Sequence, residues 1–167
     1  RRVAIAAIVE LGGEVTYYHA STLHAFGDPP RWFSWLRRLH GDEYLGIAVV
    51  IELSHTRTAD AELLYLKDLT SLEYLRLWKT QITDAGLVHL KGLTELEWLL
   101  LDNTEVADAG LVHLKGLTGL QGLYLQNTKV TDAGLAHLKG LTELQSLNLG
   151  DTKVTDAGLV HLKGLTG

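Results

Sequence analysis

The stretch TQITDAGLVHLKGLTELEWLLLDN, residues 80–103, decides the fold because nearly the same sequence recurs along the chain. Every 24 residues the sequence returns to the same threonine, aspartate and histidine. These columns are Thr80, Thr104, Thr128 and Thr152; Asp84, Asp108, Asp132 and Asp156; and His89, His113, His137 and His161. A degraded unit beginning at Thr56 precedes them. A fixed period of this length indicates stacked units, each of which buries its apolar face against its neighbours.

Each unit contains two leucine patterns. Residues 96–101 end in an alternation of inward and outward positions, which predicts a short strand. Residues 87–93 place a leucine at every third position, which predicts a short helix or 3₁₀ turn. The chain is therefore expected to alternate strand and helix, with the strands parallel.

The ends of the helices carry their own signals. Asp84 is expected to cap its helix, in competition with Thr83. The aspartate is preferred because Ala107 replaces the threonine one unit later, whereas Asp108 remains. Gly92 is expected to end the helix in a left-handed conformation.

These motifs resemble the leucine-rich repeat family, whose Leu-x-x-Leu-x-Leu pattern appears five times over about residues 48–167. The Thr-Asp-Ala-Gly-Leu variant is most similar to bacterial arrays, especially those of planctomycetes, and to F-box-type and GALA-type repeats. The resemblance implies an α/β solenoid with a parallel sheet on its concave face and short helices on its convex face. The threonine column, which begins at Thr56, is expected to hydrogen-bond turn backbone.

Residues 1–47 do not repeat and are interpreted as an α-rich N-terminal cap, with the repeat array over 48–167. The pattern predicts a helix over 3–11 with Ile5 and Ile8 inward, a break at Gly12-Gly13 and a strand over 15–18. A loop over 21–30 and an amphipathic helix from Arg31 to Leu39 should follow, with Trp32 and Trp35 in the cap core. Similarity to planctomycete membrane-anchored proteins implies that an anchor precedes Arg1; the alternative is a cytoplasmic protein.

Composition excludes several classes of function. The chain has 167 residues, of which 46% are apolar and 21% charged, as in an ordinary globular domain. The absence of cysteine excludes disulfides, thiolate nucleophiles and zinc–thiolate sites. The net charge of −5 argues against nucleic-acid binding, and no apolar run is long enough to insert into a membrane.

Chemical motifs are few. The histidine column could in principle share a metal ion, but zinc requires a closed tetrahedral cluster rather than an evenly spaced row. The segment from His40 to Glu43 offers a base and two carboxylates, yet it fits a solvated turn better. His19 and His24 lack an evident third ligand. We therefore expect no catalytic residue, no metal site and no cofactor, and an enzyme is the least favoured class.

The outward positions of the strands carry the functional signal. They are aromatic and arginine-rich in the middle units and small or polar at the flanks, which is the composition of an interface core with a polar rim. The expected partner-binding residues are Tyr74, Arg76, Trp78, Trp98, Leu100, Asp102, Tyr124 and Gln126. The alternative is lateral stacking of aromatics that only stabilises the sheet.

The sequence thus predicts a non-enzymatic module that binds a protein partner on its concave face. Two alternatives remain: a substrate-recognition component of a ubiquitin-ligase-like complex, implied by the F-box and GALA resemblance, and a structural spacer. The last unit has the same consensus sequence as the internal repeats and no polar cap. Its leucines are therefore expected to be partly uncovered, namely Leu159, Leu162 and Leu165. We therefore expect either that the array continues beyond Gly167 or that two chains meet end to end there.

Overall fold

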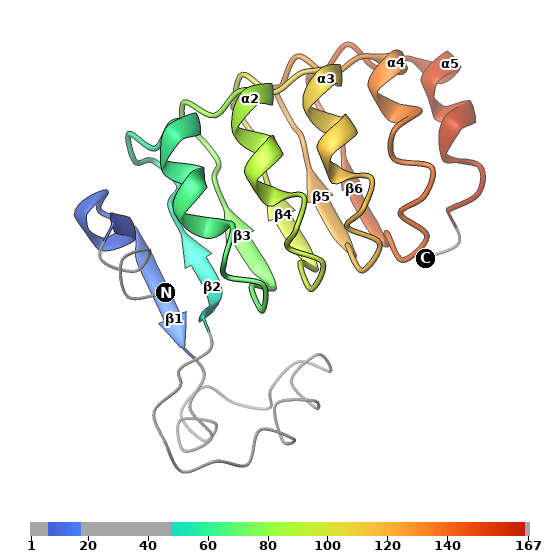
Figure 1. Cartoon of the computed structure of the whole chain (residues 1–167). Helices are drawn as coiled ribbons and strands as arrows, with labels where there is room; N and C mark the ends of the chain where they lie inside the picture. Colours follow the sequence, from blue (N-terminus) through green and yellow to red (C-terminus); the bar gives the residue numbers. More distant parts are fainter. Residues whose placement is uncertain (1–6, 18–47, 166–167) are drawn as a thin grey trace, which may run out of the picture.

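The computed structural model describes residues 7–17 and 48–165, and the description below concerns these. A six-stranded sheet follows the order of the sequence, β1-β2-β3-β4-β5-β6 (Figure 1). Strands β2 to β6 are mutually parallel, and β1 pairs with β2 in the antiparallel sense. Their bounds are β1 Glu14–Tyr17, β2 Ala48–Glu52, β3 Tyr74–Arg76, β4 Trp98–Leu100, β5 Gly122–Tyr124 and β6 Ser146–Asn148.

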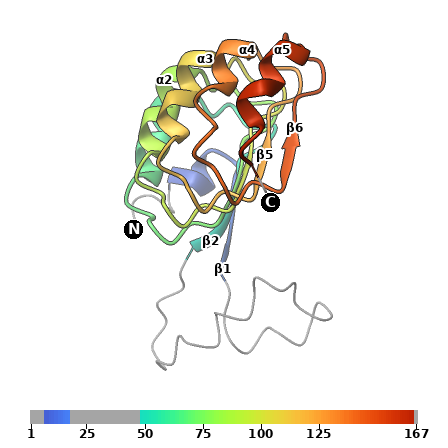
Figure 2. The ribbon, with the colours of Figure 1, turned by 90° about the vertical axis from the view of Figure 1, so that its right-hand side faces the viewer.

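Short helices alternate with these strands and line the opposite side of the solenoid, as Figures 1 and 2 show. Their bounds are η2 Asp60–Leu66, α2 Asp84–Leu87, η3 Val88–Leu90, α3 Asp108–Leu111, η4 Val112–Leu114, α4 Asp132–Leu135, α5 Asp156–Leu159 and η5 Val160–Leu162. The expected α/β solenoid, with its sheet and helices on opposite faces, is confirmed.

Leucine columns fill the space between sheet and helices. In the unit over residues 80–103 every leucine of the helix and strand patterns is 0% exposed, from Leu87 through Leu101, except the outward Leu100. Burying one such side chain contributes roughly 1.5–3 kcal/mol. Because the same positions are buried in each neighbouring unit, the core is one continuous cluster.

Residues 7–17 pack against one end of this core. Ile8, in a helical turn over 7–10, is 1% exposed and joins the core cluster, as expected. The turn ends before Gly12, whose φ of 79° suits glycine. A Cβ at Gly13 would lie 2.5 Å from Leu53 Cδ2, so this second glycine lets β1 approach β2 closely. The expected strand is present, and it extends the sheet; the second cap helix falls outside the described residues.

The aspartate of each unit bonds the next unit rather than its own helix. Thr83, not Asp84, is the N-cap of α2, because its hydroxyl accepts a hydrogen bond from Ala85 N. The Asp84 carboxylate instead accepts one from the backbone N–H of Ala107, at 2.7 Å. The expectation that the aspartate caps was therefore wrong. A residue at the first helical position points its carboxylate along the array, where the next repeat offers an unsatisfied N–H.

Asp60, Asp84, Asp108 and Asp132 form this aspartate ladder. Where the acceptor unit has a threonine, its hydroxyl adds a second bond: Thr131 donates to Asp108 through its N–H at 2.8 Å and its Oγ1 at 2.7 Å. The equivalent pair from Thr155 lowers the pKa of Asp132 below its ordinary value.

The glycine of each Asp-Ala-Gly-Leu motif follows from the ladder. A Cβ at Gly86 would lie 2.5 Å from Asp60 Oδ1, and one at Gly110 would lie 2.5 Å from Asp84 Oδ1. The aspartate of one unit and the glycine of the next are thus a packed pair. Helix η2 carries Glu62 at the glycine position, where its carboxylate accepts a hydrogen bond from Ala59 N, which is one half of a capping box.

In the repeats, the left-handed residues lie after the strands and not after the helices. Gly92 does not adopt a positive φ, so the expected left-handed helix end was wrong. The chain there continues through successive turns, in which Leu93 N bonds Leu90 O and Leu96 N bonds Leu93 O, and no reversal is needed. The positive-φ residues of the described repeats are His55, Lys79, Asn103, Asn127 and Asp151.

The threonine column behaves as expected. Each hydroxyl donates to the carbonyl three residues earlier, for example Thr80 to Leu77 O at 2.5 Å and Thr104 to Leu101 O at 2.7 Å. Thr80, Thr104 and Thr128 are buried, so these bonds satisfy carbonyls that lie away from water. At the other end of the array β6 is the outer strand of the described sheet, and Leu159 is 46% exposed, as expected.

Candidate functional site

The strand register brings the predicted binding residues together. Tyr74 lies opposite Trp98, Arg76 opposite Leu100, and Leu100 opposite Tyr124 in neighbouring strands. The intervening leucines, such as Leu75 and Leu99, are fully buried, so the predicted residues share the outer face of the sheet. The expected side-by-side placement of these residues is confirmed.

Three aromatic side chains form one row across β3, β4 and β5. The ring centroids of Tyr74 and Trp98 are 5.9 Å apart with an interplanar angle of 8°, which is a stacked pair. The centroids of Trp98 and Tyr124 are 6.3 Å apart with an angle of 32°. These three residues are called the aromatic row below. Each is half-buried, so the row presents part of its surface to solvent.

A glycine makes room for the middle ring. A Cβ at Gly122 would lie 2.5 Å from Cζ3 and 2.8 Å from Cδ2 of Trp98. The indole therefore occupies the space in front of β5 where a side chain would stand. Gly122 is buried although it is an outward position of the sheet.

Arg76 lies beside the row and is paired within the sheet. Its Nη1 is 3.3 Å from Oε2 of Glu52, and their side chains are 46% and 32% exposed. The other oxygen of Glu52 accepts a hydrogen bond from Ser54 N. Leu100 on β4 lies between Arg76 on β3 and Tyr124 on β5. The ion pair of Arg76 with Glu52 is therefore next to an apolar side chain on the outer face.

Trp78 lies at the C-terminal end of β3, apart from the aromatic row. His55 meets its ring edge to face, with centroids 4.0 Å apart and an angle of 78°. The Lys79 ammonium is 5.2 Å from the Trp78 ring centroid, within cation–π range. This side of the sheet therefore carries basic and aromatic groups together.

Asp102 and Gln126 continue that edge into the later repeats. Gln126 N donates to Asp102 Oδ1 at 2.9 Å, and Gln126 Nε2 donates to Asp151. Burial raises the pKa of Asp102, and its hydrogen bonds with backbone N–H groups oppose the change. Asn148 Nδ2 donates to Gln126 Oε1, so this part of the face is an amide network.

Two glutamates at the start of β3 and β4 were not among the predicted site residues. Glu73 is 3% exposed, and burial raises its pKa to about 8, with the neighbouring Glu97 and Glu95 adding to the shift. Burial also raises the pKa of Glu97, followed by repulsion from Glu95. One oxygen of Glu73, one of Glu97 and the Trp98 indole N–H are buried without a hydrogen-bond partner. The recurrence of glutamate after the first leucine of two successive units was the available signal.

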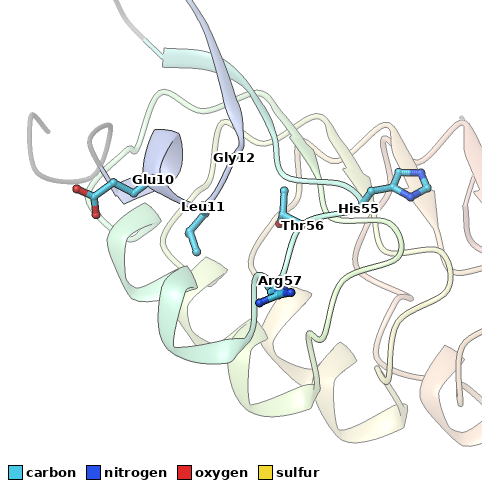
Figure 3. A pocket seen from close by; sticks show the side chains of 6 residues that line it. All are labelled: Glu10, Leu11, Gly12, His55, Thr56 and Arg57. Atoms are coloured by element: carbon cyan, nitrogen blue, oxygen red, sulfur yellow. The ribbon is translucent and has the colours of Figure 1, made fainter.

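Within the described residues, no group of three or more histidine, aspartate or glutamate side chains could hold a metal ion. A hollow of about 430 Å³ lies at the N-terminal end, lined by Glu10, Leu11, Gly12, His55, Thr56 and Arg57 (Figure 3). Glu10 and His55 point away from one another in Figure 3, so the polar groups do not converge on a ligand.

The candidate site therefore lies on the outer face of the parallel sheet. A sheet of short parallel strands that alternate with short helices defines the chain as an α/β solenoid repeat protein. Residues 141–162 match the family model described as Leucine Rich repeat, and the chain has the repeats and the solenoid fold of leucine-rich repeat proteins. No curated protein matches the sequence.

Solved structures of the same fold are similar over part of the chain. An internalin (inlF) from Listeria monocytogenes is 29% identical with a TM-score of 0.56, and covers 62% of this chain and 29% of its own. An internalin C2 (inlC2) from the same organism is 31% identical with a TM-score of 0.52, covering 60% and 42%. This chain therefore spans less than half the length of these internalins.

A plant structure shares the fold over most of the chain. A chain of the BIR3–SERK2 complex from Arabidopsis thaliana is 17% identical, with a TM-score of 0.56, and the match covers 93% of this chain and 84% of that one. Among residues 7–17 and 48–165, no helix is long and apolar enough to cross a membrane.

Proposed function

We propose that this protein is a non-enzymatic interaction module that binds a protein partner on the outer face of its sheet, across the aromatic row. The observation that carries this proposal is the division between constant and variable positions in the repeats. The helix sequence Asp-Ala-Gly-Leu is identical in α2, α3, α4 and α5. The outward positions differ from unit to unit, and the first of them reads Val50, Tyr74, Trp98, Gly122 and Ser146.

When the residues of only one face differ between repeats, we expect that face to contact a molecule that does not itself repeat. The fold needs the helix face to repeat because adjacent helices pack on one another through the aspartate ladder. The outward sheet positions are free of that constraint and carry Tyr, Trp, Arg and Leu in the middle units. Such residues are enriched at the centres of protein interfaces.

The competing function is a structural spacer whose aromatic row only stabilises the sheet. The contact of Trp98 with both Tyr74 and Tyr124 favours that alternative. The two functions differ in what removal of Trp98 does, because a spacer loses stability whereas an interaction module loses binding.

The experiment is a quantitative pull-down from source lysate with the wild-type chain, Trp98→Ala and Tyr74→Ala. Val112→Ala is the control, because Val112 is a 41% exposed aliphatic side chain on the helix face. Binding of the captured protein should weaken by about 2 kcal/mol or more in both aromatic variants and remain in the control. If both aromatic variants bind normally but unfold at much lower temperature, the face is structural and the proposal is wrong.

A further inference from the structure

We infer that Gly122 determines the specificity of the aromatic row, and that the surface it creates fits a partner presenting an uncharged apolar polypeptide segment across β3, β4 and β5. This inference rests on the proposed function, because it concerns the same face. It adds a residue that contacts no partner itself and a chemical class for the partner.

The first step concerns why residue 122 is glycine. At the equivalent position the other parallel strands carry Val50, Tyr74, Trp98 and Ser146. Among these strands, only β5 has no side chain at this position. Gly122 has no positive φ, and the backbone therefore does not require glycine. Glycine in a strand also costs stability relative to a residue with a side chain. The requirement comes from the indole of Trp98, whose Cζ3 would lie 2.5 Å from a Cβ at this position.

The second step concerns what the glycine makes possible. Trp98 can lie across β5 only while residue 122 has no Cβ, and from that position it stacks on Tyr74 and contacts Tyr124. A methyl group at residue 122 displaces the indole, and the displaced ring cannot keep both contacts. Gly122 thus joins the side chains of three strands into one continuous surface.

The third step concerns charge. The outward residues of β3, β4 and β5 are Tyr74, Arg76, Trp98, Leu100, Gly122 and Tyr124. Arg76 is the one charged member of that set, and Glu52 neutralises it. Burial favours the neutral form of Glu73, the nearly buried acid next to Tyr74, and raises its pKa. A surface without net charge gives no attraction to a polyanion or polycation, whereas aliphatic or aromatic side chains bury well against it.

The test uses a phage-displayed library of random peptides, selected on the immobilised wild-type chain. Peptides that lose binding to Trp98→Ala are retained as ligands of the aromatic row. Their affinities are then measured for Gly122→Ala and for Gly92→Ala, the matched control, in which the added methyl meets no atom within 4 Å. Near-ultraviolet circular dichroism of the free proteins reports the environment of the indole, and thermal unfolding reports folding.

We expect the retained peptides to carry uncharged aliphatic or aromatic anchors, and to bind Gly122→Ala about tenfold more weakly or worse. Gly122→Ala should change the near-ultraviolet circular dichroism spectrum. Gly92→Ala should change neither that spectrum nor the peptide affinity. Should Gly122→Ala fold poorly, the double variant Trp98→Ala/Gly122→Ala provides the second measurement: without the indole the added methyl meets no ring, so the stability loss caused by Gly122→Ala should disappear in the Trp98→Ala background.

Three results would overturn the inference in different ways. Retained peptides that bind Gly122→Ala as tightly as wild type exclude a role for Gly122 but leave the proposed function standing, and so does a stability loss from Gly122→Ala that persists in the Trp98→Ala background. Retained peptides dominated by charged residues contradict the partner class alone. A selection in which no peptide depends on Trp98 contradicts the proposed function itself.

Discussion

Replacing Asp108 by alanine should destabilise the protein far more than the same change at Asp156. Both residues open a helix in an identical Asp-Ala-Gly-Leu context, so intrinsic helix propensity and dipole effects are matched. They differ in what lies beyond them. Asp108 accepts two hydrogen bonds from Thr131, whereas the described residues offer no partner to the Asp156 carboxylate.

The magnitude follows from the bonds lost. A hydrogen bond to a charged group contributes about 1.5–3 kcal/mol, and partial exposure of these pairs places them at the low end. Asp108→Ala should therefore cost roughly 3 kcal/mol. Asp84→Ala should cost about half of this, because Ala107 donates only its backbone N–H to Asp84. Asp156→Ala should remain within about 0.5 kcal/mol of wild type.

The assay is urea unfolding followed by far-ultraviolet circular dichroism, with thermal unfolding as a second measurement. At this chain length a loss of 1 kcal/mol lowers Tm by roughly 2–4 °C, so the three variants separate clearly. The order Asp108, Asp84, Asp156 is the informative result. Equal losses at Asp108 and Asp156 would mean that the aspartate acts on its own helix, and the ladder would have no energetic role.

Three further outcomes follow from particular residues. The pKa of Glu73 rises from 4.5 to about 8 in the folded chain, so the folded state binds the extra proton between these values and stability falls as pH rises through that window. Glu73→Gln should remove that dependence, which is on the order of 2–4 kcal/mol, in urea titrations at pH 5 and pH 8; an unchanged pH slope would contradict this. Gly110→Ala should cost roughly 1–3 kcal/mol by calorimetry because its methyl meets Asp84 Oδ1, whereas Gly92→Ala should be neutral or slightly stabilising. If chains meet end to end at the exposed Leu159, then Leu159→Lys should abolish a concentration-dependent dimer in sedimentation experiments, and a strictly monomeric wild type would refute the contact.

The repeat period and the leucine spacing were sufficient to predict the solenoid. Burial of every third residue on the helix and every second on the strand is a local property, visible in a single unit such as residues 80–103. Register between strands then follows automatically, because each unit has the same length as its neighbour. That is why Tyr74 and Trp98 could be placed side by side from sequence alone.

The wrong expectations concern contacts between units. Asp84 looks like a helix cap in one repeat, and only the stacked array reveals that the N–H of Ala107 lies within its reach. Gly92 looks like a helix stop, although the chain there needs no reversal. The close approach of Trp98 to Gly122 was missed for the same reason, since a side chain that crosses to the next strand leaves no local pattern. Burial of Glu73 likewise depends on the packed units and not on its neighbours in sequence.

The aspartate ladder also accounts for the contrast between the two faces of the solenoid. A change at Asp84 removes a bond to the following unit, and a change at Gly110 places a methyl on the Asp84 carboxylate of the preceding one. Each helix is therefore constrained from both sides, and a substitution there requires a compensating change in another repeat. The backbone ladder that joins the strands does not depend on the identity of the outward side chains, so these positions can vary more freely. Gly122 is the exception on that face, because the Trp98 indole requires it as strictly as the Asp84 carboxylate requires Gly110. We propose that this packing constraint is retained because the indole it positions forms part of the surface that a partner contacts.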